Sequence, residues 1–191
     1  MSPITHFLVS WVIADSLFDD EGDKGRVCAA GVLCDLDGLG VIPDILNDLL
    51  KRDETNYYGA FHHVLLHGVL GTVLIAAALT MGAKRKWRVF WAALVTAHLH
   101  LLCDLLGSRG ADPGDIWPIY YFGPFTRHPQ IYWHGQWRLD GWQNITLTLG
   151  LVFYALFRAW RDDRSPLSLF SARAHRAVVE TLRARFGNPK S

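Results

Sequence analysis

The chain has 191 residues, of which half are hydrophobic and 19% are charged, and its mean hydropathy is slightly positive at +0.12. This length suits one domain with an adequate core, and the apolar composition predicts helices that are buried on most sides, in protein or in lipid. A formal net charge of +1 argues against a broad nucleic-acid-binding surface.

The N-terminal part of the chain predicts short helices separated by loops. Ser2 and Pro3 are typical of an N-cap and a first-turn proline, so we expect a helix from there to about Ala14. The charged segment 18–26 contains glycines and predicts a loop. A short apolar run then leads to a short helix over 43–50.

Two long apolar segments follow. The segment 64–83 carries no charged residue over a length close to the roughly 20 residues that span a bilayer. The segment 89–106 predicts a second long apolar helix. A basic turn joins them and contains Lys84, Arg85, Lys86 and Arg88.

The remainder of the chain combines a long loop with two helices. Residues 107–144 are rich in glycine, proline and aromatic residues, and loops of this length are uncommon without a role. A helix is expected over 145–160. A last, amphipathic helix from Ser165 to Gly187 carries arginines that would face anionic lipid or water.

We therefore expect an all-α fold, an up-and-down helical bundle in one domain over 1–191. Its parts are ligand-bearing helices over 1–106, an aromatic-rich loop over 107–144 and C-terminal helices over 145–191. Histidines and aspartates fall at alternating ends of the apolar segments, so the bundle would gather them at one end. The expected metal ligands are His6, Asp35, Asp37, His62, His67, His100 and Asp104.

His100 and Asp104 are the strongest pair. They lie four residues apart on one helix face, so both could hold the same metal ion. Burying them is costly unless they are partnered, and a hydrogen-bonded pair without metal is the alternative. His98 lies about 160° around the helix from His100 and is expected to be a core or supporting residue.

Three histidines within six residues are hard to explain by packing alone. His63 and His67 share one face of a regular helix, whereas His62 reaches the same centre only if it precedes the first turn. One of the three is expected to be a bystander.

Asp35 and Asp37 supply paired carboxylates that suit a metal ion or a base beside one. A calcium EF-hand is excluded, because Leu39 and Leu46 occupy two of its acidic positions. Asp37 is the first candidate for a catalytic role, orienting a metal-activated water. The expected substrate contacts lie in the aromatic loop and are Trp117, His128 and His134.

The order and spacing of these residues resemble the YdjM family of inner-membrane-associated metal-dependent hydrolases. The likeness covers about residues 1 to 125 and consists of Thr5-His6, Asp35-Leu36-Asp37, His62-x4-His67-Gly68, His100-x3-Asp104 and Trp117-Pro118. It implies that His62 and His67 are ligands. The family is in turn distantly similar to zinc-dependent phospholipase C, an all-helical protein with clustered zinc ions.

The chain departs from the family's usual pattern, His-Arg-Gly-x-Thr-His-Ser and Pro-Asp-x-Asp-His, at several positions. His63 replaces the arginine, Leu66 the threonine, Cys34 the proline and Gly38 the histidine. The implied ligand positions are intact, but the arginine, which would suit a phosphate, is missing.

The sequence thus predicts a metal-dependent hydrolase with a divalent metal, most simply zinc, at a site of two or more ions. Such ions activate water and can clamp a phosphoester, so a phospholipid or another phosphodiester is the expected substrate class. The alternatives are a membrane-associated metal-binding or regulatory protein without turnover, and a helical membrane scaffold whose histidines are core residues.

The resemblance to the YdjM family implies the inner (cytoplasmic) membrane, and the basic clusters predict the orientation. The turn around Lys86 and the arginines Arg158, Arg161 and Arg164 would lie in the cytoplasm by the positive-inside rule. The metal site and the aromatic loop would then face the non-cytoplasmic side, in contact with membrane lipid. A soluble or peripheral bundle is the alternative, because apolar core helices mimic membrane spans and Asp104 in lipid would be costly.

Overall fold

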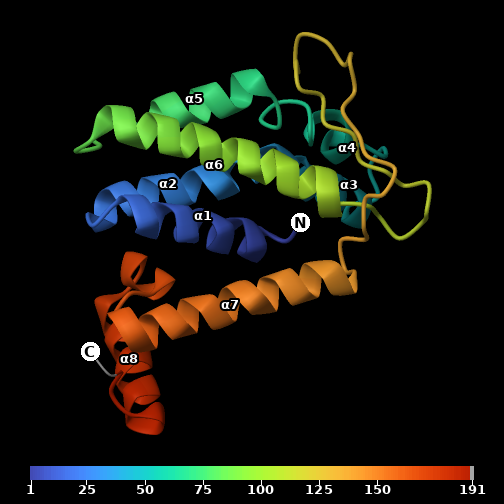
Figure 1. The fold of residues 1–191 in the computed structure, drawn as a ribbon. Coiled ribbons are helices and arrows are strands. Elements are labelled where there is room, and N and C mark those ends of the chain that lie inside the picture. Colours follow the sequence, from blue (N-terminus) through green and yellow to red (C-terminus); the bar gives the residue numbers. More distant parts are fainter. Residues whose placement is uncertain (190–191) are drawn as a thin grey trace.

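The computed structural model describes residues 1–189, and this part of the chain is built from helices and loops without a strand. Its four central helices are α1 (Pro3–Leu17), α2 (Glu21–Leu33), α5 (Val69–Leu79) and α6 (Lys86–Gly107). They lie side by side, with α2 between α1 and α6, and with α5 packed on α6 (Figure 1). The all-α bundle predicted from the sequence is confirmed.

The remaining elements lie at the two ends and along one side of this bundle. Between α2 and α5 lie the 3-10 helix η1 (Cys34–Gly40) and the short helices α3 (Val41–Leu49) and α4 (Tyr57–Phe61), at the same end as the N-terminus (Figure 1). Helix α7 (Trp142–Asp162) packs along α1. The 3-10 helix η2 (Pro166–Leu169) and helix α8 (Ala172–Phe186) lie at the opposite end, where α8 crosses α7 (Figure 1).

The predicted loop over 18–26 is wrong, because helix α2 already begins at Glu21. Buried Asp23 accepts hydrogen bonds from the main-chain nitrogens of Lys84 (3.0 Å) and Arg85 (3.2 Å). Buried Lys24 contacts Asp15 at 3.1 Å. The charged groups of Asp23 and Lys24 thus have partners within the protein, so their burial does not prevent the segment from being helical.

The predicted long helix over 64–83 is also wrong, since α5 covers only Val69–Leu79. The preceding residues form an irregular turn in which His63 has a positive φ of 63°. The Leu66 nitrogen donates to Asp37 (2.9 Å) and the Val69 nitrogen to the Tyr121 carbonyl (2.8 Å). Contacts to distant segments therefore replace the helical hydrogen bonds here. The last helix likewise begins at Ala172, after η2, rather than at Ser165.

Small residues let α2 approach its neighbours closely. A Cβ added to Gly31 would lie 1.7 Å from the Ser10 Oγ of α1. Ala30 on α2 packs in one buried cluster with Ala93 and Ala97 of α6. This close packing holds the C-terminal end of α2, and η1 after it, against the C-terminal half of α6.

Two buried amides fix the aromatic loop to the end of α6. Gln136 donates to the Asp104 carbonyl (2.9 Å) and accepts a hydrogen bond from the Trp117 nitrogen (3.0 Å). Asn144 donates to the Gly107 carbonyl at 2.8 Å. The long loop is thereby held over the end of the bundle that carries the predicted ligands, and its Trp117 packs against the rings of His62 and His63.

The outer surface of the bundle is unusually apolar. Trp87 and Trp91 of α6 are 76% and 59% exposed, and Phe153 of α7 is 70% exposed. Within residues 1–189, α6 is the one helix long and apolar enough to cross a membrane. Exposed apolar surface on this scale is typical of contact with lipid or with another protein.

Candidate metal centre

Four of the predicted ligands meet between η1, the turn before α5 and helix α6. They are Asp35, His67, His100 and Asp104, whose ligand atoms all lie within 4.8 Å of one another. The Nε2 atom of His100 lies 3.0 Å from His67 Nε2, 3.0 Å from Asp104 Oδ2 and 3.5 Å from Asp35 Oδ1. The Nε2 atom of His67 lies 3.4 Å from Asp104 Oδ2 and 3.8 Å from Asp35 Oδ1.

These separations fit a single metal ion. Metal–ligand distances of about 2.0–2.2 Å in a tetrahedral zinc site place the ligand atoms roughly 3.3–3.6 Å from one another. The separations of the four atoms scatter around this range. Two imidazole nitrogens and two carboxylate oxygens are also a donor set that suits zinc and similar divalent metals.

The other ring nitrogens of the two histidines are held by the protein. His100 Nδ1 donates to the Gly31 carbonyl (2.9 Å), and His67 Nδ1 donates to Asp37 Oδ2 (3.0 Å). A carbonyl and an ionised carboxylate only accept hydrogen bonds, so we assign the ring proton to Nδ1 in both residues. Metal-binding histidines are typically oriented in this way by a carbonyl or carboxylate partner.

The consequence is that two Nε2 lone pairs face each other across 3.0 Å. This arrangement is repulsive unless a proton or a metal cation lies between the rings. Burial alone would lower the pKa of His67, but its hydrogen bonds with Asp104 and Asp37 raise it to about 9. The raised pKa of His67 favours a proton on the metal-free cluster, and a metal ion bound at His67 Nε2 would displace this proton.

Asp37 is the centre of a supporting network. Its Oδ1 accepts a hydrogen bond from His62 Nδ1 (2.9 Å), and its Oδ2 accepts from His67 Nδ1 and the Leu66 nitrogen. Burial alone would raise the pKa of Asp37, but the hydrogen bonds from His62 and His67 hold it well below its usual range. The structure thus places Asp37 behind the cluster, with both carboxylate oxygens engaged.

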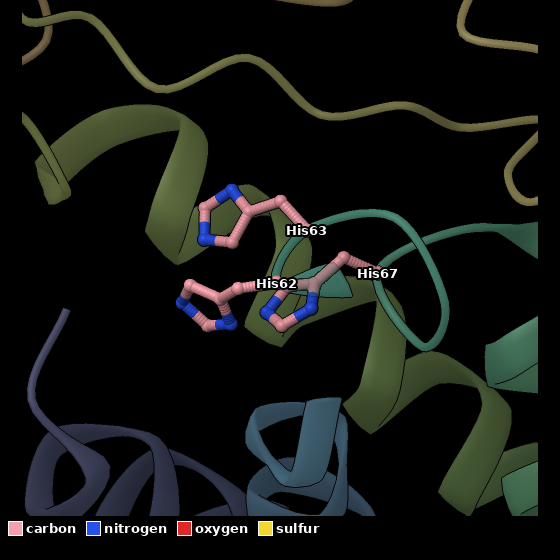
Figure 2. Close-up of side chains that lie close together, drawn as sticks. All are labelled: His62, His63 and His67. Carbon is pink, nitrogen blue, oxygen red and sulfur yellow. The ribbon is translucent and has the colours of Figure 1, made fainter. Parts of the chain in front are cut away.

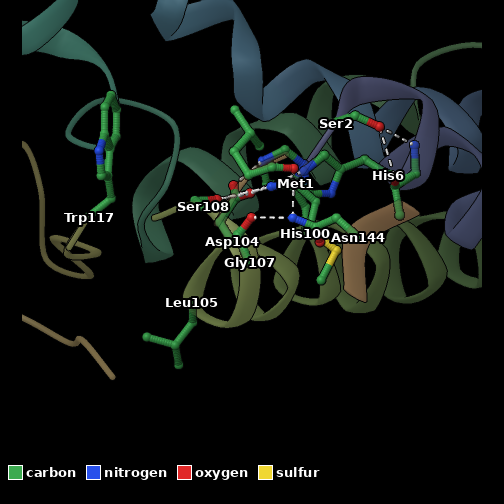
Figure 3. Close-up of polar contacts among 12 residues, drawn as sticks. Met1, Ser2, His6, His100, Asp104, Leu105, Gly107, Ser108, Trp117 and Asn144 are labelled. Atoms are coloured by element: carbon green, nitrogen blue, oxygen red, sulfur yellow. Dashed lines mark hydrogen bonds and ion pairs between the residues drawn. The ribbon is translucent and has the colours of Figure 1, made fainter. Parts of the chain in front are cut away.

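His6 lies on the opposite side of the cluster. Its ring stacks on His100 with centroids 3.8 Å apart, and its Nε2 atom lies 3.2 Å from Asp104 Oδ1. The same carboxylate oxygen contacts the Met1 nitrogen and accepts a hydrogen bond from Ser108 Oγ at 2.7 Å (Figure 3). Among the described residues, buried His6 Nδ1 and Asp35 Oδ2 have no hydrogen-bond partner, which fits a site that receives a cation.

The three neighbouring histidines form a second group that shares His67 (Figure 2). His62 lies 5.1 Å from His67 between ring centroids, and His63 stacks on His67 at 4.4 Å. The turn is irregular, so the helical-face argument that separated His62 from His63 does not apply here. His98 bonds the Leu94 carbonyl and the Tyr121 hydroxyl instead, in line with its expected supporting role.

A cavity of about 360 Å³ leads from the surface to this cluster. Asp35 and Asp104 line its inner part, and Tyr58, His62 and Trp117 form aromatic walls. No lysine or arginine of the described residues lines it. Of the expected substrate contacts, Trp117 is therefore in place, whereas exposed His128 and His134 lie outside the cavity lining.

The sequence analysis missed several groups of the site. Ser108 lies four residues after Asp104, so the helical spacing that paired His100 with Asp104 could have identified it. Tyr58 packs on His62 with centroids 4.6 Å apart and lies four residues before it, so the same spacing could have identified it. The Gly31 carbonyl and the Leu66 nitrogen are main-chain atoms, which carry no sequence signal.

The family comparison covers nearly the whole chain. The model of the family described as YdjM inner membrane protein matches residues 1–172. The chain belongs to the YdjM family. This membership supports association with the inner membrane, and the match extends beyond the segment on which the sequence resemblance was based. No curated protein and no solved structure matched the chain, so the likeness of the YdjM family to phospholipase C stays a prediction.

Substitution of a direct metal ligand should have a larger effect than substitution of a residue that positions the ligands. His100→Ala removes a direct ligand and is expected to abolish stoichiometric metal binding. Asp37→Asn removes the charge that holds two histidines and should weaken metal affinity by about 10–100-fold. Metal content and affinity are measured by elemental analysis and competitive titration of the purified protein.

His98→Ala is the matched control for His100→Ala, because the two residues share one helix and His98 faces Tyr121 instead of the cluster. It should retain the metal content of the unmodified protein. Equal metal content in the His100→Ala and His98→Ala proteins would contradict this assignment.

Proposed function

We propose that the protein is a metal-dependent hydrolase of a phosphoester, with phospholipid as the leading substrate. The observation that carries the proposal is a four-donor cluster whose inner wall opens into a cavity. Four protein donors fill a tetrahedral shell, so catalysis here requires that the ion take water or substrate as a fifth ligand from the side of the cavity. The side chain of Asp35 is 28% exposed while those of His67 and His100 are fully buried, so the cluster is accessible on one side.

The contacts of these side chains suggest which would bind metal and which would position the ligands. Asp35, His67, His100 and Asp104 would hold one ion, and His62, His63 and His67 form a second group of nitrogen donors beside it. A bound divalent metal lowers the pKa of water and stabilises negative charge on a phosphoryl oxygen. Because both Asp37 oxygens already accept hydrogen bonds, we infer that Asp37 acts by positioning His62 and His67 rather than as a free base.

A phosphoester would be held in the cavity mainly by the metal. The lining carries carboxylates and imidazoles but no lysine or arginine among the described residues, and its ammonium group at Met1 is paired with Asp104. The competing function, metal binding without turnover, shares the ligands but does not require the cavity. The cavity, with aromatic walls formed by Tyr58 and Trp117, therefore favours a function in which a substrate enters the site.

The test is hydrolysis with controlled metal loading. Protein stripped by chelation should lose activity on aryl phosphodiesters and on phospholipid dispersed in detergent, and added zinc or manganese should restore it. Asp104→Asn keeps the shape of the side chain but removes its charge, and added metal should not restore its activity. Fully metal-loaded wild-type protein that hydrolyses no phosphoester would support binding without turnover.

We further propose that the site faces the non-cytoplasmic side of the membrane. The basic turn before α6 and the arginines at the end of α7 lie at one end of the bundle, where Lys84 contacts Asp20 and Arg158 contacts Asp15. The metal centre lies at the other end (Figure 1). The positive-inside rule favours a cytoplasmic location for the basic end.

Cysteine labelling tests this orientation. Single cysteines at Met81 and Phe125, which are 78% and 81% exposed, are introduced into protein whose native cysteines have been replaced. A membrane-impermeant thiol reagent applied from the periplasmic side should label position 125 and spare position 81. The opposite pattern would reverse the orientation, and release of the protein by carbonate would exclude insertion.

A further inference from the structure

A second hollow lies beside the metal cavity, between α1, α2, α7 and η2. Its volume is about 730 Å³, and no charged side chain of the described residues lines it. Its walls include Ile4, Phe7, Ala29, Val32, Val152 and Phe170. We call it the apolar groove.

The apolar groove begins where the metal cavity ends. Pro3 lines both hollows, and Val32 lies at the end of α2, three residues before Asp35. From Val32 the groove follows α2 back to Gly25, seven residues away, which corresponds to about 10 Å of helix. The rings of Phe7 and Phe170, with centroids 5.5 Å apart, bound it on the side of η2.

Small side chains on α2 keep the groove open. Gly25, Cys28 and Ala29 form its floor, and a Cβ at Gly25 would reach only van der Waals distance, 4.0 Å, from Leu169. Larger residues at these positions would fill the space between α2 and η2. The protein thus presents a polar, metal-binding cavity and an elongated apolar groove with a shared wall.

We propose that the apolar groove binds an acyl chain of a phospholipid whose phosphate ester lies in the metal cavity. The assignment of the phosphate end rests on the proposed function, whereas that of the acyl chain rests on the groove itself. A molecule with a phosphate head and an apolar tail matches the two adjoining hollows, because the tail loses contact with water along the groove. The membrane association of the YdjM family supplies such molecules at the surface of the protein.

Photolabelling tests the groove without requiring catalysis. Detergent-solubilised protein is exposed to a phospholipid with a diazirine in its acyl chain, and labelled peptides are identified by mass spectrometry. We expect labels on the α1 and α2 residues that line the groove. Ala29→Phe fills the groove and should reduce this labelling at least fivefold, with metal content unchanged.

The matched control is Ala78→Phe, the same substitution at an exposed position of α5 outside the groove. It should leave the labelling of α1 and α2 unchanged. Ile4→Trp, at a side chain that is 62% exposed, provides a second way to obstruct the groove if Ala29→Phe does not fold. Labels spread evenly over α5, α6 and α7, or unaffected by both groove variants, would show nonspecific lipid contact and overturn the proposal.

Activity measurements separate this proposal from the proposed function. Ala29→Phe should retain hydrolysis of a soluble aryl phosphodiester, which has no acyl chain, and lose at least tenfold on phospholipid. Equal rates of Ala29→Phe and wild type on phospholipid would contradict the role of the groove. If wild-type protein hydrolyses neither compound, the hydrolase function fails, and the photolabelling still decides whether the groove binds an acyl chain.

Discussion

The arrangement of the helices around the metal centre depends on one contact. The Nε2 atoms of His67 and His100 lie 3.0 Å apart. Their Nδ1 atoms are held by Asp37 and by the Gly31 carbonyl, so neither ring can turn away without losing a buried hydrogen bond. This constraint requires the end of α2 to lie against α6, so that the Gly31 carbonyl reaches His100. It also explains why the chain before α5 forms an irregular turn, in which Leu66 and His67 both bind Asp37.

The two ends of the bundle have opposite chemistry. One end gathers the aspartates and histidines under the aromatic loop, and the other pairs its charges in contacts such as Lys24 with Asp15. Between them the helices expose large apolar side chains, including Trp91 and Phe153. This distribution suits the membrane association of the YdjM family.

Much of the site could be predicted from local rules. Helical spacing paired His100 with Asp104, and the alternation of helices brought His6 and Asp35 towards the same end. The rest depends on contacts between distant segments. No local pattern shows that Asp37 binds the turn after His62, or that this turn holds a residue at positive φ. Nor does one show that buried Asp23 accepts hydrogen bonds from the main chain at Lys84 and Arg85, in a charged segment that is helical.

The central claim is that two imidazoles and two carboxylates bind one divalent metal. X-ray absorption spectroscopy of the metal-loaded protein tests it most directly. The account predicts a shell of about four nitrogen and oxygen atoms at about 2.0–2.2 Å, with the outer scattering of imidazole and no sulfur. A sulfur neighbour at about 2.3 Å, or purified protein that takes up no stoichiometric metal, would contradict it.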